Sequence, residues 1–249
     1  DKILGKRCYN SILDIQDSVD LAVIAVNAGI VPVVMKECAK KKVKGVVIIS
    51  AGFGEHGEEG KKLEAEVVKI AKKARIRIIG PNCLGIMRPS SNLNASFGPC
   101  MAPEGSVAFF SQSGALVDSV IDWALERDYG FSAVVSLGNQ SDLSISDFLE
   151  WAKNDKETKS IALYIEGLKD GRAFMKAAKK TSLKKPIVVL KAGKTDAGMK
   201  AAGSHTGSLA GSYEIYKAAF RQSGVIVAEN VDELFEVADT LAKERALKE

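Results

Sequence analysis

The stretch Val107-Ala-Phe-Phe-Ser-Gln-Ser-Gly-Ala-Leu-Val-Asp-Ser-Val-Ile121 predicts one strand, one tight turn and the start of one helix. Its first four residues are all apolar, as in a strand that is buried on both faces of a sheet. Small residues follow from Ser111 to Ala115, and apolar residues then recur from Leu116 at helical spacing. A strand that leads through a short turn into a helix is the unit of parallel α/β folds.

The same unit repeats to the end of the chain. Predicted strands cover Val107 to Phe110, Ser132 to Ser136, Ile161 to Ile165, Ile187 to Leu190 and Val225 to Val227. Predicted helices lie near residues 114–127, 144–153, 171–180, 211–222 and 231–247. This alternation is typical of a flavodoxin-like doubly wound domain, whose ligands bind at the carboxyl ends of the strands.

A shorter α/β pattern precedes it. Apolar strands are predicted at Leu21 to Val26, Gly45 to Ser50 and Ile76 to Ile79, with helices near 33–42 and 60–73 between them. We therefore expect a second parallel sheet with helices on both of its faces. The chain then divides into a first domain (1–88), a linker rich in Pro, Ser, Asn and Gly (89–104) and the flavodoxin-like domain (105–249).

The composition is that of a folded globular chain. The 249 residues are 46% hydrophobic and 27% charged, which excludes intrinsic disorder. The net charge is only +4, and positive residues are scattered among acidic ones, so we expect no nucleic-acid partner. The longest apolar run, Leu21 to Met35, contains Asn27 and Pro32 and is shorter than the ~20 residues of a membrane-spanning helix.

The cysteines and the N-terminus give further expectations. The 4 cysteines form no CxxC pair, so neither a zinc site nor a redox motif is predicted, and the metal prediction is none. Without a signal peptide the expected location is cytoplasmic. The chain opens on Asp1 rather than Met, and its first residues carry no strand or helix signal, so we expect the first domain to be N-terminally incomplete.

The turn Ser111-Gln112-Ser113-Gly114 is a candidate anion site. It joins the end of a buried strand to a helix N-terminus, where backbone N–H groups without intrahelical partners and the positive end of the helix dipole favour phosphate. Ser111 or Ser113 could equally be a plain N-cap residue.

Two more strand or loop features could meet the same crevice. His205 lies in a loop of small residues, Gly203 to Ser208, and is one of only 2 histidines, the other being His56. Glu166 ends its own strand and could orient His205 by accepting a hydrogen bond from one imidazole nitrogen. For His205 the alternative is a solvated loop residue, and for Glu166 a helix cap. Asp142 also follows a strand and could cap the next helix.

Four motifs together carry a family resemblance. Gly80-Pro-Asn-Cys-Leu-Gly85, Ser111-Gln-Ser-Gly114, Tyr164-Ile-Glu-Gly167 and Gly203-Ser-His-Thr-Gly-Ser-Leu-Ala210 occur in this order. With their spacing they resemble the α subunit of NDP-forming acyl-CoA synthetases, relatives of the succinyl-CoA synthetase α subunit. The ADP-forming acetyl-CoA synthetase branch is the most similar, over essentially the whole chain from about Ile12.

The resemblance implies a Rossmann-like CoA-binding domain before the flavodoxin-like one, and a phosphoryl relay. Acyl-CoA and phosphate give an acyl phosphate and CoA, and the phosphoryl group passes to a histidine matched by His205, then to ADP. Glu166 matches the glutamate that orients the histidine, and Ser111, Gln112, Ser113 and Gly114 match the helix N-terminus that holds its phosphate. On the CoA and acyl side the candidates are Gly52, Phe53, Asn82 and Cys83, in loops that follow strands.

The resemblance also implies partners. Nucleotide (ADP or ATP with Mg) would bind an ATP-grasp β subunit or a fused segment, so a hetero-oligomer acting on a small carboxylic acid or acyl-CoA is expected. Family members begin with a glycine-containing turn for the CoA phosphates, and no such turn precedes Leu21. We therefore expect about two βα units to be missing and CoA to bind this segment poorly.

Two other functions fit part of the pattern. Ser113, an acid and His205 occur in the order of an α/β hydrolase, but Ser111 and Ala115 stand where its Gly-x-Ser-x-Gly turn needs glycines. A non-catalytic CoA-sensing module is the other alternative, and the presence of His205 argues against it.

Overall fold

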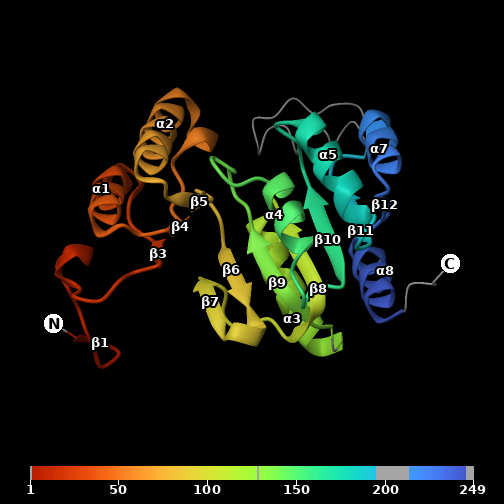
Figure 1. The fold of residues 1–249 in the computed structure, drawn as a ribbon, viewed down its shortest axis with the longest axis horizontal. Coiled ribbons are helices and arrows are strands. Elements are labelled where there is room, and N and C mark those ends of the chain that lie inside the picture. Colours follow the sequence, from red (N-terminus) through yellow and green to blue (C-terminus); the bar gives the residue numbers. More distant parts are fainter. Residues whose placement is uncertain (1, 128, 195–212, 245–249) are drawn as a thin grey trace.

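The predicted strand, turn and helix at residues 107–121 are β8 (Glu104–Ser111) and the first half of α3 (Gly114–Arg127). The computed structural model describes residues 2–127, 129–194 and 213–244 (Figure 1). β8 is the central strand of a seven-stranded sheet with the order β12-β11-β10-β8-β9-β6-β7. The fold is therefore organised around the segment with the clearest α/β pattern.

The second domain has the predicted flavodoxin-like topology. β8 pairs in parallel with both β9 and β10, and β10, β11 and β12 continue the parallel order. The elements are β9 (Phe131–Ser136), α4 (Ile145–Ala152), β10 (Ser160–Ile165), α5 (Gly171–Ser182), β11 (Ile187–Lys191), α7 (Tyr213–Gln222), β12 (Ile226–Val227) and α8 (Val231–Lys243). Counted along the chain, the parallel strands lie in the order 5-4-3-1-2, which confirms the doubly wound prediction.

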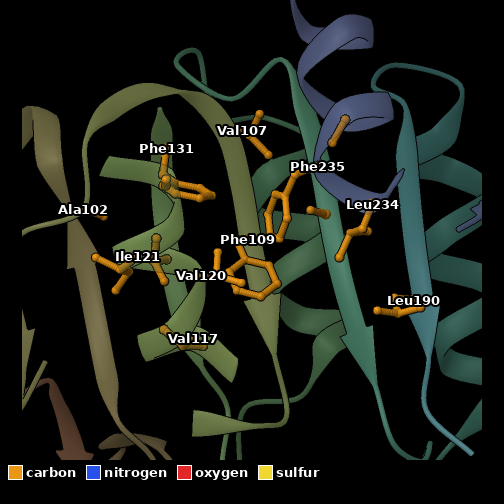
Figure 2. Packing of buried hydrophobic residues seen from close by; sticks show 14 of the residues in the cluster. Ala102, Val107, Phe109, Val117, Val120, Ile121, Phe131, Leu190, Leu234 and Phe235 are labelled. Carbon is orange, nitrogen blue, oxygen red and sulfur yellow. The ribbon is translucent and has the colours of Figure 1, made fainter. Parts of the chain in front are cut away.

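Two separate cores form because successive side chains of β8 point to opposite faces of the sheet. Phe109 faces α3 and α8, and its ring meets that of Phe235 edge-on with centroids 5.0 Å apart (Figure 2). Phe110 faces the other way and packs with residues of α4, α5 and α7. Both rings are fully buried, so the central strand is covered on both faces as its unbroken apolar run predicts.

The range predicted as a linker contains a strand. β6 (Gly85–Arg88) and β7 (Leu93–Ser96) form an antiparallel hairpin around the 3-10 turn η4 (Pro89–Ser91), and β6 pairs antiparallel with β9. The polar residues in β7 suggested a loop, but β7 is the outer strand of the sheet, where one edge and part of one face are open to solvent. No strand is predicted within 89–104 from the sequence, and β7 is the difference. The domain bounds themselves stay a prediction.

The first domain contains the predicted βαβαβ unit. Its strands β3 (Leu21–Ile24), β4 (Gly45–Ile48) and β5 (Arg77–Ile79) are parallel and adjacent in that order, with α1 (Val31–Lys41) and α2 (Gly57–Ala74) as crossovers. Short elements surround them: β1 (Lys2–Ile3), β2 (Lys6–Arg7), η1 (Ile12–Asp14), η2 (Ala28–Ile30) and η3 (Gly54–His56). Among the described helices none is both long and apolar enough to cross a membrane.

Both helices of this domain cover one face of its sheet, which differs from the expected two-sided cover. α1 and α2 contribute to the same cluster as the inward residues of β3, β4 and β5, and Figure 1 shows them on the same side. The strand order explains this, because two right-handed crossovers that step in the same direction place both helices on the same face.

The two sheets are joined along β5. The segment after β9 runs beside β5, where Asn139, Ser141 and Leu143 donate backbone hydrogen bonds to the carbonyls of Pro81 (2.8 Å), Gly80 (3.1 Å) and Ile78 (3.2 Å). The predicted alternative role of Asp142 as a helix cap is not seen, because its carboxylate accepts from the backbone N–H of Ile78 (2.9 Å) and from Arg77 (2.8 Å). Ser144 and Asp147 form the capping box of α4 instead.

Gly138 is required where this segment turns. Its φ is +55°, and a Cβ built there would lie 2.1 Å from the carbonyl oxygen of Pro81 and 2.5 Å from that of Asn82. Both neighbours are backbone atoms, so neither can move aside without shifting the first domain. The junction depends on a residue without a side chain.

We expect Gly138→Ala to lower the free energy of unfolding by roughly 1 to 3 kcal/mol, the usual range for overpacking, and to loosen the junction. Chemical denaturation measures the change. The control is Gly171→Ala, since a Cβ there meets nothing within 4 Å and alanine favours the first turn of α5. Equal stability of the two variants would contradict the packing argument.

Candidate functional site

A cleft of about 1090 Å³ opens where the two domains meet. Its lining follows β3, β4 and β5 of the first domain and β8, β9 and β10 of the second. Carboxyl ends of parallel strands from two sheets thus converge on one cavity, which is where doubly wound folds bind ligands.

Most of the predicted site residues line this cleft together. They are Asn82, Cys83, Gln112, Ser113, Gly114 and Glu166. Ser111, Gly52 and Phe53 do not line it, and the exposed His56 does not either. His205 lies outside the described residues, so its predicted role stays a prediction.

Ser111 shapes the turn rather than facing the cavity. Its side chain is fully buried, and its hydroxyl accepts from the backbone N–H of Ser113 (3.0 Å) and donates to the Ser113 carbonyl (2.9 Å). Ser113 Oγ in turn accepts from the N–H of Leu116 (3.2 Å), as an N-cap residue does. These bonds leave Gly114 and Ala115 at the start of α3 with backbone N–H groups that have no acceptor within the helix. Both residues line the cleft, and their role in an anion site stays a prediction.

Gln112 holds the end of β10 in place. Its side-chain oxygen accepts from the backbone N–H groups of Glu166 and Gly167, the latter at 3.0 Å, and its amide nitrogen donates to the Gly167 carbonyl (2.7 Å). Gln112 was predicted as a phosphate ligand, but its side chain is committed to this bridge. It fixes Glu166 relative to the N-terminus of α3.

Two residues near Glu166 were missed by sequence reasoning. Lys191 ends β11 and is 3% exposed; burial lowers the pKa of its ammonium group, while the Glu166 charge acts in the opposite direction. Its Nζ lies 4.6 Å from the ring centroid of Tyr216. Tyr164 lies in β10, two residues before Glu166, and burial and the Glu166 charge both raise the pKa of its hydroxyl. A lysine after an apolar run, IVVLK, was the available signal.

On the first-domain side, Phe53 and Cys83 are structural. Phe53 is fully buried in the core under α2, and a Cβ on Gly60 would lie 1.8 Å from its carbonyl oxygen, so helix and loop touch closely. Burial raises the pKa of the Cys83 thiol to about 12, and its Sγ donates to the Ile48 carbonyl (3.3 Å). Cys83 is therefore a neutral thiol and not a nucleophile.

A polar bridge that the sequence did not suggest spans the mouth of the cleft. The Asn139 amide nitrogen lies 2.5 Å from Glu55 Oε2 and 2.9 Å from Glu64 Oε2. Burial acts to raise the pKa of Glu55, but hydrogen bonds from Asn139 and from the backbone of Gly52 outweigh it and lower the pKa. Both carboxylates belong to the first domain and Asn139 to the second.

The cleft carries more negative than positive charge. Glu55, Glu64, Asp118 and Glu166 line it against Lys61 and Lys169. An anionic ligand there must be held mainly by backbone N–H groups, as at the start of α3. In the described part of the chain no group of three or more His, Cys, Asp or Glu side chains could hold a metal ion.

These features define a two-domain α/β protein with a ligand cleft at the junction, and comparisons with known proteins identify the class. Residues 104–241 match the succinyl-CoA ligase like flavodoxin domain, and residues 1–89 match a CoA binding domain. The chain belongs to the succinyl-CoA ligase-like flavodoxin family.

Individual relatives are similar in sequence over nearly the whole chain. The chain is 52% identical to an ADP-forming acetate–CoA ligase of Archaeoglobus fulgidus, covering 98% of this chain and 36% of the relative. It is also 52% identical to the α subunit of ADP-forming acetate–CoA ligase II of Pyrococcus furiosus, covering 96% and 52%.

A solved structure agrees over nearly the whole chain. Acetyl-coenzyme A synthetase 1 of Candidatus Korarchaeum cryptofilum, in complex with phosphate and ADP, superimposes with a TM-score of 0.92 at 42% identity, covering 97% of this chain and 52% of that one. The chain thus spans about a third to a half of the length of these three relatives.

We expect Cys83 to resist alkylation in the folded protein. At pH 8 a thiol with a pKa of about 12 is ionised in about one molecule in 10⁴, so iodoacetamide finds almost no thiolate. Mass-spectrometric peptide mapping should find Cys83 unmodified while the half-buried Cys8 reacts. After unfolding both should react, and equal native rates would show that Cys83 is not a buried neutral thiol.

Proposed function

We propose that this chain carries the CoA and phosphohistidine steps of an ADP-forming acyl-CoA ligase, an acid–thiol ligase. Phosphate attacks the thioester of acyl-CoA to give an acyl phosphate and CoA. The imidazole of His205 takes the phosphoryl group and releases the carboxylic acid, and phosphohistidine then transfers it to ADP to give ATP. Each step is reversible. The observation that supports this most strongly is the junction cleft, which unites the CoA-side loops with Glu166 and the start of α3.

The residues around Glu166 suit a phosphoryl site. The backbone N–H groups of Gly114 and Ala115 can donate hydrogen bonds to phosphate oxygens, and they are held in place by the fold, unlike a flexible charged side chain. Glu166, fixed by Gln112, would accept a hydrogen bond from one nitrogen of His205 and leave the other to receive phosphate. The positive charge of Lys191 offsets part of the negative charge of Glu166.

Nucleotide binding is assigned to another unit. In this proposal ADP or ATP with Mg binds an ATP-grasp β subunit or a fused segment, giving a hetero-oligomer or a longer chain. The Pyrococcus furiosus relative is named an α subunit, which supports a two-component assembly. Four free thiols suit a reducing cytoplasm, where we place the protein.

The alternatives are weaker. A serine hydrolase needs a nucleophilic Ser113, but Ser113 Oγ accepts the N-cap hydrogen bond from Leu116 and the turn lacks the required glycines. A CoA sensor has no use for the His205 motif.

We expect His205 to become phosphorylated. Labelled ATP with an ATP-grasp partner should place an acid-labile, base-stable label on this chain, because phosphoramidates hydrolyse in acid. His205→Ala should remove the label, and His56→Ala, which changes the exposed histidine outside the cleft, should keep it. Label that survives acid, or that persists in His205→Ala, contradicts the proposal, and fluorophosphonate capture of Ser113 would favour the hydrolase.

Glu166→Gln should slow this phosphorylation by a factor of about a hundred or more, the range for carboxylates that orient catalytic groups. The amide keeps the shape and an acceptor but loses the charge that stabilises an imidazolium-like state. Single-turnover labelling measures the rate. Glu126→Gln, on the exposed end of α3, is the control. Unchanged kinetics in Glu166→Gln would assign Glu166 to structure alone.

A further inference from the structure

The first-domain loop at the cleft has its backbone donors occupied by carboxylates. Glu55 Oε1 accepts from the N–H groups of Gly52 (2.6 Å) and Phe53 (3.1 Å), and Glu64 Oε2 accepts from that of Gly54 (3.0 Å). Three consecutive N–H groups are therefore directed at two acidic side chains. The loop conformation depends on where these carboxylates lie.

A neutral amide from the other domain holds both carboxylates. Asn139 donates one hydrogen to each, and within the described residues neither Glu55 nor Glu64 forms an ion pair. Two negative groups that converge on one point repel each other unless donors separate them. Asn139 is that donor, since its –NH₂ carries two hydrogens and no charge.

The backbone of Asn139 is itself fixed from two sides. Its backbone N–H donates to the Pro81 carbonyl (2.8 Å), and Gly138 permits the close approach. Lys169 Nζ donates to the carbonyls of Asn139 (2.7 Å) and Gln140 (3.2 Å). Lys169 follows Glu166 by three residues, so the phosphohistidine side and the first-domain loop meet at this one turn.

We propose that Asn139 is a positioning residue for the CoA side of the reaction: its side-chain amide, on a backbone whose carbonyl Lys169 binds, holds the Gly52–Glu55 loop against the second domain. This rests on the proposed function, which assigns that loop to the CoA side. Asn139 touches no reacting atom. It acts through Glu55 and Glu64, and it couples the two walls of the cleft.

Replacing the amide with a carboxylate tests this directly. Asn139→Asp puts three carboxylates together, so hydrogen exchange of the peptide covering residues 51–56 should speed up at least tenfold. In the full α chain with its ATP-grasp unit, KM for CoA should rise about tenfold or more, while the rate of His205 phosphorylation from ATP should change less than threefold. Asn154→Asp makes the same change on an exposed turn and should alter none of these.

Reversing the donors should rescue the variant. In N139D/E55Q/E64Q the glutamine oxygen at position 55 can still accept from the N–H groups of Gly52 and Phe53 while its amide donates to the aspartate. Glu64 uses one oxygen for both Gly54 and Asn139, so the glutamine amide at position 64 donates to the aspartate by giving up the bond from Gly54. Exchange and KM for CoA should return to within about threefold of the wild type. If N139D does not fold, Asn139→Leu removes the donors without adding charge and should change both quantities in the same direction by a smaller factor.

The outcomes separate the two proposals. Unchanged exchange in both N139D and N139L, or a triple variant no better than N139D, overturns the positioning role. Faster exchange with an unchanged KM for CoA overturns the assignment of the loop to CoA but leaves the proposed function intact if His205 is still phosphorylated. Loss of phosphorylation in the wild type would refute the proposed function, and the exchange result would still decide the structural role of Asn139.

Discussion

The backbone pairing between the segment after β9 and the edge of β5 is the constraint on which the site depends. Three N–H groups, from Asn139, Ser141 and Leu143, bond to first-domain carbonyls, so the loop of one domain covers the open edge of the other domain's sheet. The bonds fix spacing and direction together, as in a sheet. Because β9 and β5 both end at this contact, their carboxyl ends face one cavity. Without this contact between the domains, the strand ends of the first domain and those of the second domain would not line the same cavity.

Polar side chains around the cleft mainly hold backbone groups. Gln112 binds the end of β10, Asp142 binds the N–H of Ile78, and Glu55 and Glu64 bind the loop after β4. Each closes hydrogen bonds that a strand end or a glycine-rich turn would otherwise leave open to water. The backbone held in this way directs the N–H groups of Gly114 and Ala115 at the cleft. Two of the four carboxylates that line the cleft, Glu55 and Glu64, are thus engaged with donors of their own, and the backbone N–H groups at the start of α3 stay directed at the cavity.

The α/β alternation was predictable because short, unbroken apolar runs such as Val107 to Phe110 indicate strands that are buried on both faces, and helical patterns lie between them. The β6–β7 hairpin could not be predicted in this way. As an outer strand, β7 tolerates the polar residues Asn94 and Ser96, so its composition is that of a loop. Strand-end positions led to the expectation that Glu166 and the Ser111–Gly114 turn share a crevice, and Glu166 and Ser113 line one cavity together with Asn82. Local patterns could not distinguish Gln112 as a bridge from Gln112 as a phosphate ligand. Asn139 and Lys191 owe their roles to neighbours far away in sequence, which a single sequence does not reveal.

The state of Cys83 constrains the chemistry on the CoA side. A thiol whose pKa is raised to about 12 is ionised in about one molecule in 10⁵ at pH 7, too few to form an acyl-cysteine at a useful rate. In the proposed reaction, direct attack of phosphate on the thioester therefore needs no acyl-cysteine, and it requires phosphate and thioester in the cleft together. Cys83 packs against Gly80, where a Cβ would lie 2.9 Å from its Sγ, so its side chain fills the space next to the Gly80 backbone. The only nucleophile that the proposed relay needs from this chain is His205. The other residues of the cleft would orient its imidazole, as Glu166 does in the proposal, or bind phosphate, as the N–H groups of Gly114 and Ala115 do.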